Sequence, residues 1–133
     1  MSNWVIDLDN IIFTRINVKL NKALSAKYPD LYVTNSDLNT GVAKFPTVYI
    51  HVMPGVEQGN DLDGNTINAI LYSIQLEVTA TNQTHTKEVM AELINILKEM
   101  RFQVIAMPEF KNQNTLYRQV LRVRRVIGAD DKF

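Results

Sequence analysis

The sequence contains no cysteine, and its 133 residues include only 5 glycines, 4 prolines and 1 tryptophan. Without cysteine the chain has no disulfide bond, no thiol nucleophile and no thiolate ligand for a metal ion. No apolar run approaches the roughly 20 residues that a membrane-spanning helix requires. Residues 1–7 lack the basic start and apolar segment of a signal peptide. We therefore expect a protein that assembles in the cytoplasm and has no membrane partner.

A net charge is also missing, because 14 Lys and Arg residues balance 14 Asp and Glu residues. A dedicated nucleic-acid-binding protein is usually basic, so any contact with DNA is expected to be local or incidental. A chain without net charge also self-associates more readily, since little electrostatic repulsion opposes contact. Hydrophobic residues make up 46% and charged residues 21%, which is typical of a globular protein. At this length we expect one domain over residues 1–133.

Apolar residues with helical spacing predict two helices. The first covers residues 7–27, and Pro29 ends it because a proline forces the preceding residue out of the helical conformation. The second covers residues 85–100. The apolar stripe of the first helix consists of residues four apart, namely Leu8, Ile12, Ile16, Leu20 and Leu24. One apolar stripe on a helix is what packing against one side of a sheet requires.

Alternation of apolar and polar residues predicts the strands. The longest candidate, residues 67–81, has the pattern of an antiparallel strand with one buried face. A long polar loop, residues 54–66, precedes it. The other candidates are residues 31–34, 46–53, 102–107 and 115–127. We predict an α+β fold: a single domain with a mostly antiparallel four- to five-stranded sheet packed by two helices, in the order α-β-β-α-β-β.

The last predicted strand is rich in arginine. Its sequence over residues 116–127, LYRQVLRVRRVI, places Arg118, Arg122 and Arg124 on one face and mostly apolar residues on the other. A row of guanidinium groups can bind carboxylates, phosphates or a neighbouring subunit, or face the lumen of a ring. Exposed arginines at a sheet edge can alternatively serve only to prevent aggregation. Arg125 falls on the apolar face, so we expect either a carboxylate partner there or a bulge that shifts the register.

The polar loop is acidic, because it contains Glu57, Asp61 and Asp63. Its sequence around Gly64 resembles a calcium-binding loop, but Ile70 falls where the last ligand must be a carboxylate. We therefore predict no metal site and no cofactor. Its charge makes this loop a candidate partner for the arginine row across a subunit boundary.

The two histidines, His51 and His85, are the remaining candidates for catalysis. A hydrolytic triad needs a nucleophile, a base and an orienting acid, and no nucleophile motif accompanies either histidine. We expect no catalytic residue and no enzyme; an enzyme would have to use His51, Glu77 and the acidic loop. Another alternative is a small nucleic-acid-binding module, in which the arginines contact phosphates and Tyr72 or Tyr117 stacks on a base.

In the order of these elements and in several short sequence segments, the chain resembles the small tail-completion or tail-terminator proteins of tailed bacteriophages. The resemblance covers nearly the whole chain and is carried by the first helix, FPTVYI at residues 45–50, the polar loop and the long alternating strand. It continues in LKEMRF at residues 97–102 and in the arginine-rich strand at residues 117–128. Many such proteins have glycine before this phenylalanine where this chain has Arg101, so we expect the helix to end differently.

The resemblance implies a mixed α/β domain that assembles as a ring, commonly of six subunits. Such a ring caps the tail tube, stops its polymerisation and offers a docking surface for the neck of the head. The implied partners are further copies of the chain, the tail tube protein and a neck or head-completion protein, while DNA only passes through the lumen. The implied location is the virion tail. A neck or head-completion adaptor is the alternative within the same class.

Overall fold

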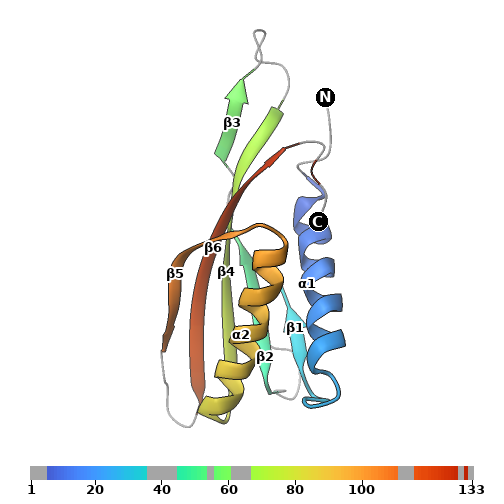
Figure 1. Ribbon diagram of the computed structural model, residues 1–133, viewed down its shortest axis with the longest axis vertical. Coiled ribbons are helices and arrows are strands. Elements are labelled where there is room, and N and C mark those ends of the chain that lie inside the picture. Colours follow the sequence, from blue (N-terminus) through green and yellow to red (C-terminus); the bar gives the residue numbers. More distant parts are fainter. Residues whose placement is uncertain are drawn as a thin grey trace.

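In the computed structural model, the described residues are 6–35, 45–53, 56–60, 67–110, 116–128 and 131. They form two helices, α1 (Leu8–Leu24) and α2 (Gln83–Glu99). Their strands are β1 (Tyr32–Thr34), β2 (Thr47–Val52), β3 (Val56–Asn60), β4 (Ile67–Ala80), β5 (Gln103–Phe110) and β6 (Tyr117–Gly128). Figure 1 shows both helices in front of one twisted sheet. The predicted α+β class, with a single domain, is confirmed.

One sheet contains all the described strands, in the order β1-β2-β4-β6-β5, with β3 paired to β4 beside this path. β1 and β2 are parallel, whereas the other pairings are antiparallel. β6 pairs with β4 from Ala69↔Gly128 to Ala80↔Tyr117, and β2 and β3 pair in turn along the opposite edge of β4. The predicted mostly antiparallel sheet is therefore confirmed, with β1 and β5 as its outer strands.

The structure contains a strand that the sequence pattern did not predict. β3, with the sequence VEQGN, lies inside the segment 54–66 that we expected to be a loop. It pairs with the first residues of β4, from Val56↔Leu71 to Asn60↔Ile67, and this hairpin extends beyond both helices in Figure 1. Because neither described helix covers the hairpin, β3 needs no apolar alternation, and its pairing with β4 alone defines it as a strand. The prediction of a continuous loop is wrong for residues 56–60, while residues 61–66 lie outside the described part of the chain.

The hydrophobic core lies between the two helices and the sheet face that they cover. Its fully buried side chains, each at most 3% exposed, include Leu8, Ile12, Ile16 and Leu20 on α1, Val89, Leu93 and Leu97 on α2, and Ile74, Leu76, Val78, Leu121 and Val123 on the sheet. The sheet residues among them alternate along β4 and β6, as a half-buried sheet requires. Burying one such side chain stabilises the fold by about 1.5–3 kcal/mol, so this layer determines which face of each strand points inward.

Tyr72, on the buried face of β4, gives a test of this core. Its side chain is 4% exposed, and its hydroxyl has no hydrogen-bond partner among the described residues. Burial, followed by the charge of Asp9, raises the pKa of Tyr72. A buried hydroxyl without a partner is destabilising, so Tyr72→Phe should raise the free energy of unfolding by about 1 kcal/mol, measured by urea denaturation.

The matched control is Tyr28→Phe. The Tyr28 hydroxyl donates a hydrogen bond to the carboxylate of Glu88, so removing it should lower stability rather than raise it. A Tyr72→Phe protein that is less stable than the wild type would show that the Tyr72 hydroxyl has a favourable interaction.

Candidate functional site

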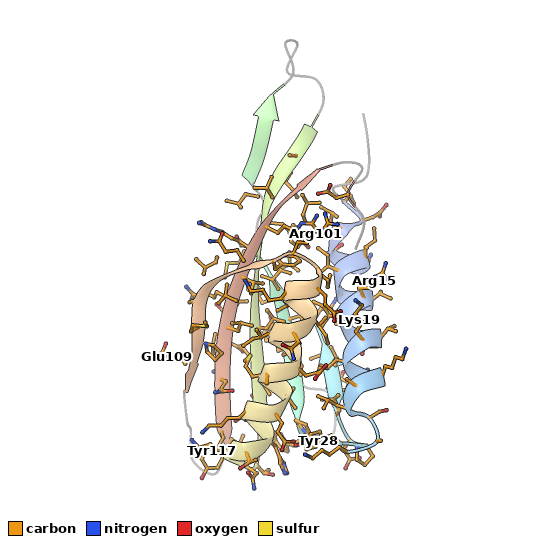
Figure 2. The ribbon with its side chains drawn as sticks, viewed as in Figure 1. Arg15, Lys19, Tyr28, Arg101, Glu109 and Tyr117 are labelled. Carbon is orange, nitrogen blue, oxygen red and sulfur yellow. The ribbon has the colours of Figure 1, made fainter. Side chains whose placement is uncertain are left out.

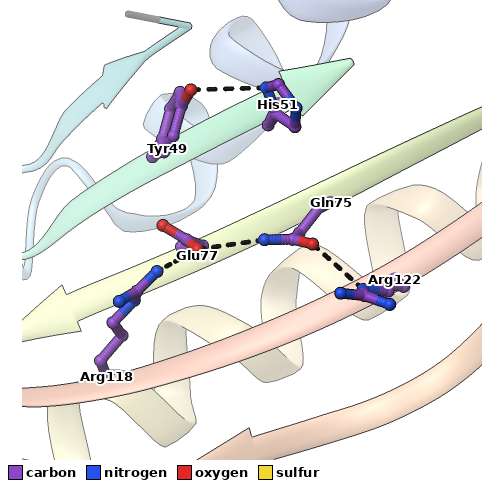
Figure 3. A network of polar contacts seen from close by, with 6 residues as sticks. All are labelled: Tyr49, His51, Gln75, Glu77, Arg118 and Arg122. Carbon is purple, nitrogen blue, oxygen red and sulfur yellow. Dashed lines mark hydrogen bonds and ion pairs between the residues drawn. The ribbon is translucent and has the colours of Figure 1, made fainter. Parts of the chain in front are cut away.

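The face of the sheet opposite the helices carries a network of polar side chains from β4 and β6 (Figure 3). Arg118 forms an ion pair with Glu77 through its Nη2 atom. Gln75 Nε2 donates to Glu77 Oε1 at 3.1 Å, and Arg122 Nε donates to Gln75 Oε1 at 3.0 Å. These contacts follow from the register, because Gln75 lies directly opposite Arg122 in the β4–β6 pair. The network therefore links two neighbouring strands across the open face.

The predicted arginine row is present on this face. Arg122 and Arg124 are exposed and Arg118 is half-buried, whereas Leu121 and Val123, on the opposite face of β6, are fully buried. The alternation of β6 is therefore confirmed from Leu121 to Ile127, whereas Gln119 and Val120, nearer the start of the strand, are both buried.

The three arginines nevertheless have different surroundings. Arg118 and Arg122 are held by Glu77 and Gln75 of the same chain, whereas Arg124 has no hydrogen bond or ion pair to any described residue. Sequence reasoning missed Gln75 and Glu77 as partners. Both residues lie on the polar face of the longest predicted strand. This position predicts contacts with the arginines only once β4 is known to pair with β6.

The acidic half of the predicted interface is only partly visible. Glu57 lies in β3, opposite Ile70 of β4, and its side chain is outside the described part of the structure. Asp61 and Asp63 also lie outside the described residues. A contact between these residues and the arginine row stays a prediction.

Arg125 has the carboxylate partner that its position on the apolar face predicts. It is 9% exposed, and its Nη2 donates to Asp131 Oδ2 at 3.0 Å while its Nη1 donates to the Met100 carbonyl at 2.9 Å. Asp131 also accepts the N–H of Gly128 at 2.9 Å. The β4–β6 register is unbroken here, and the irregularities lie between β5 and β6. The first of the two expected arrangements, a carboxylate partner, is therefore confirmed.

The end of α2 is closed by Arg101 in a conformation that glycine usually adopts. Arg101 has φ 67° and is the only non-glycine residue with positive φ in the described part of the chain. The N–H of Arg101 donates to the carbonyl oxygen of Lys98 at 3.0 Å, and the N–H of Phe102 donates to that of Leu97 at 2.9 Å. These two hydrogen bonds form the Schellman motif of a helix end. The expected departure from a glycine-like helix end is not found. This backbone conformation costs a residue with a side chain about 1–2 kcal/mol.

An open pocket lies beside this turn. It is lined by Leu71, Arg101, Gln103, Arg124, Arg125 and Val126. Figure 2 shows Arg101 at the end of α2, where the chain turns into β5. The pocket thus brings together arginines from the helix end and from β6, and sequence reasoning missed both Arg101 and Gln103 as members of one site.

The two histidines lie on opposite sides of the sheet. On the open face, His51 Nδ1 lies 3.4 Å from the hydroxyl of Tyr49 (Figure 3). His85, in the first turn of α2, packs edge-on against Tyr28 with ring centroids 5.1 Å apart. The structure therefore does not bring the two rings together, and each has a tyrosine neighbour.

Among residues 6–35, 45–53, 67–110, 116–128 and 131, no group of three or more His, Asp and Glu side chains is arranged to hold a metal ion. Neither described helix has the length and apolar character needed to cross a membrane.

No protein-family model matches the chain, and no curated protein matches it.

Replacing Asp131 tests the role of the buried arginine. Asp131→Asn leaves the Arg125 guanidinium without its carboxylate, so we expect a loss of about 1–3 kcal/mol in the free energy of unfolding. The value lies at the low end for a buried pair because the Asp131 side chain is 36% exposed. Asp30→Asn, which neutralises an exposed carboxylate, is the control for urea denaturation. Equal stability of the two variants would contradict a structural role for the Arg125–Asp131 pair.

A second cluster gives the fold a defined pH dependence. Burial and then the Glu88 hydrogen bond raise the pKa of Tyr28 to about 12. Hydrogen bonds, first from Lys27 and then from Tyr28, lower the pKa of Glu88 below its usual 4.5. The Glu88 contribution is therefore present above pH 4.5 and is lost as the pH falls. The Tyr28 contribution is present below pH 10.0 and is lost as the pH rises through about 12.

We expect Glu88→Gln to reduce the dependence of the melting temperature on pH under acidic conditions. The melting temperature of the wild type should fall more steeply between about pH 5 and pH 3 than that of the variant, because only the wild type must protonate a stabilised carboxylate. Glu92→Gln, on the same helix, is the matched control and should keep the wild-type slope. A profile for Glu88→Gln that is parallel to the wild type would overturn this assignment.

Proposed function

We propose that the protein is a structural subunit of the tail-terminator type, which forms a closed ring that caps a tail tube, stops its polymerisation and docks the neck of the head. A closed ring requires head-to-tail contacts, in which one surface of a subunit meets a different surface of the next. The subunit offers several separate surfaces of this kind: the open face of the sheet, the outer strand β5 and the projecting β3–β4 hairpin (Figure 1).

The observation that carries the proposal is the number of exposed apolar side chains on the neighbouring strands β5 and β6. Ile105, Met107 and Val126 are 47%, 73% and 53% exposed, and the exposed Arg122 and Arg124 lie on β6 as well. Aliphatic, methionine and arginine side chains together are typical of the centre of a protein interface. Among the described strands, β5 is paired on one side only, so its second edge can form hydrogen bonds with another chain.

The β3–β4 hairpin supports the same conclusion. A two-stranded hairpin without a packed face is marginally stable in water, and this one extends beyond both helices. Contact with a second subunit or with the tail tube would supply the packing that the subunit itself does not provide. We propose that the acidic residues Glu57, Asp61 and Asp63 form part of this contact. They would bind two members of the arginine row, Arg122 and Arg124, in a neighbouring copy.

Light scattering over a concentration series tests the ring. We expect a discrete mass near six subunits for the wild type and a monomer for Arg122→Glu combined with Arg124→Glu, because the changed charges would repel the acidic patch. The matched control is Arg15→Glu combined with Lys22→Glu, which makes the same charge change on exposed positions of α1 and should keep the ring.

Two results would count against the proposal. A wild-type monomer at every concentration would contradict spontaneous ring formation. A ring that survives charge reversal at Arg122 and Arg124 would remove these two arginines from the interface. Disruption by the α1 control alone would place the interface on α1 instead.

A further inference from the structure

Arg101 is an unfavourable residue for the position it occupies. The turn after α2 is closed by backbone hydrogen bonds from Arg101 to Lys98 and from Phe102 to Leu97, and neither bond involves the guanidinium group. Glycine would form the same turn without the steric strain that a side chain causes at φ 67°. Strained backbone conformations of this kind are concentrated at functional sites. The strain therefore indicates that the Arg101 side chain has a function, such as binding a ligand.

The guanidinium groups of Arg101 and Arg124 are both without a hydrogen bond or ion pair to the described residues, and both side chains are exposed. They line the same pocket, whose wall also contains Arg125. Arg125 is engaged by Asp131 and by the Met100 carbonyl. The charge of Arg125 is thus offset by Asp131, whereas an anion bound between Arg101 and Arg124 would offset the charges of these two guanidinium groups.

We propose that this pocket binds a carboxylate supplied by another protein chain, with Arg101 and Arg124 donating hydrogen bonds to its oxygens. Two guanidinium forks can hold one carboxylate in a planar, multiply hydrogen-bonded geometry that a lysine cannot reproduce. Gln103, which lies opposite Arg124 in the β5–β6 pair, adds an amide to the same wall. The site shares Arg124 with the proposed ring contact, but it does not include Arg118 and Arg122, and its binding of a carboxylate does not require a ring.

The surroundings favour a protein carboxylate over a nucleic-acid phosphate. A nucleic-acid backbone requires a track of cations, but Arg118 and Arg122, which would continue this one along β6, are held by Glu77 and Gln75. Leu71 and Val126 also line the pocket. Apolar walls suit the aliphatic part of an aspartate or glutamate and its neighbours in a peptide better than they suit a phosphodiester.

The test is binding of a fluorescein-labelled peptide of six glutamates, measured by fluorescence anisotropy at low salt. Arg101→Gly should weaken binding by about tenfold, because it removes one fork of a charge-assisted pair. The same variant should melt about 3–6 °C higher than the wild type, because glycine removes the strain. A loss of affinity in a more stable protein cannot be attributed to unfolding.

Two further variants separate a defined site from general attraction. Arg101→Lys keeps the charge but not the fork, and should also lose affinity. Arg15→Gln removes one positive charge from α1, on another surface (Figure 2), and should bind the peptide as the wild type does. Equal losses in Arg15→Gln and Arg101→Gly would overturn the pocket in favour of diffuse electrostatic attraction.

The remaining outcomes also decide the question. No binding of the peptide to the wild type, or wild-type affinity in Arg101→Gly, overturns the proposal. Tighter, Arg101-dependent binding of a twelve-nucleotide single-stranded DNA would replace the carboxylate by a phosphate and overturn it as well. Because the ring is tested by molar mass and the pocket by peptide affinity, either proposal can fail while the other stands.

Discussion

The long central strand β4 is the element on which the rest of the structure depends. It has 14 residues, pairs with β6 along one edge and with β2 and β3 along the other, and alternates buried and half-buried side chains over residues 70–80. Successive side chains of a strand point to opposite faces, so one register fixes which face meets the helices and which stays open. A slip of one residue would bury Gln75 and Glu77 and expose Ile74 and Leu76.

Arg125 links β6 to two other segments at the end of the sheet. It is the one arginine of β6 that lies on the core face, and it joins the C-terminal turn at Asp131 to the end of α2 at Met100. A cation near a helix C-terminus also interacts favourably with the helix dipole. By holding these segments together, Arg125 fixes the wall of the pocket in which Arg101 and Arg124 lie. A buried charge thus supports the fold and shapes the surface beside it.

Several described parts of the chain leave polar groups or strand edges without a partner, and another chain could supply that partner. Within the described part of the chain, β5 has no strand on its outer edge, neither helix covers the β3–β4 hairpin, and Arg101 and Arg124 have no anionic partner. Each feature is unfavourable in the isolated subunit and becomes favourable on contact. A protein that assembles with other chains is expected to have such surfaces. The tail-terminator proposal accounts for the β5 edge and the hairpin, the carboxylate pocket accounts for Arg101, and both proposals involve Arg124.

The sequence by itself determined the two helices, the long alternating strand, the opposed faces of β6 and the position of Arg125 among apolar residues, because these depend on periodicity within one segment. It did not determine β3, whose polar sequence is a strand only through its pairing with β4. It could not pair Arg118 with Glu77 or Arg122 with Gln75, because the β4–β6 register joins residues 41 and 47 positions apart. The left-handed conformation of Arg101 and its meeting with Arg124 also required the tertiary structure. Local patterns define which face of an element is apolar, whereas long-range packing decides which polar groups meet.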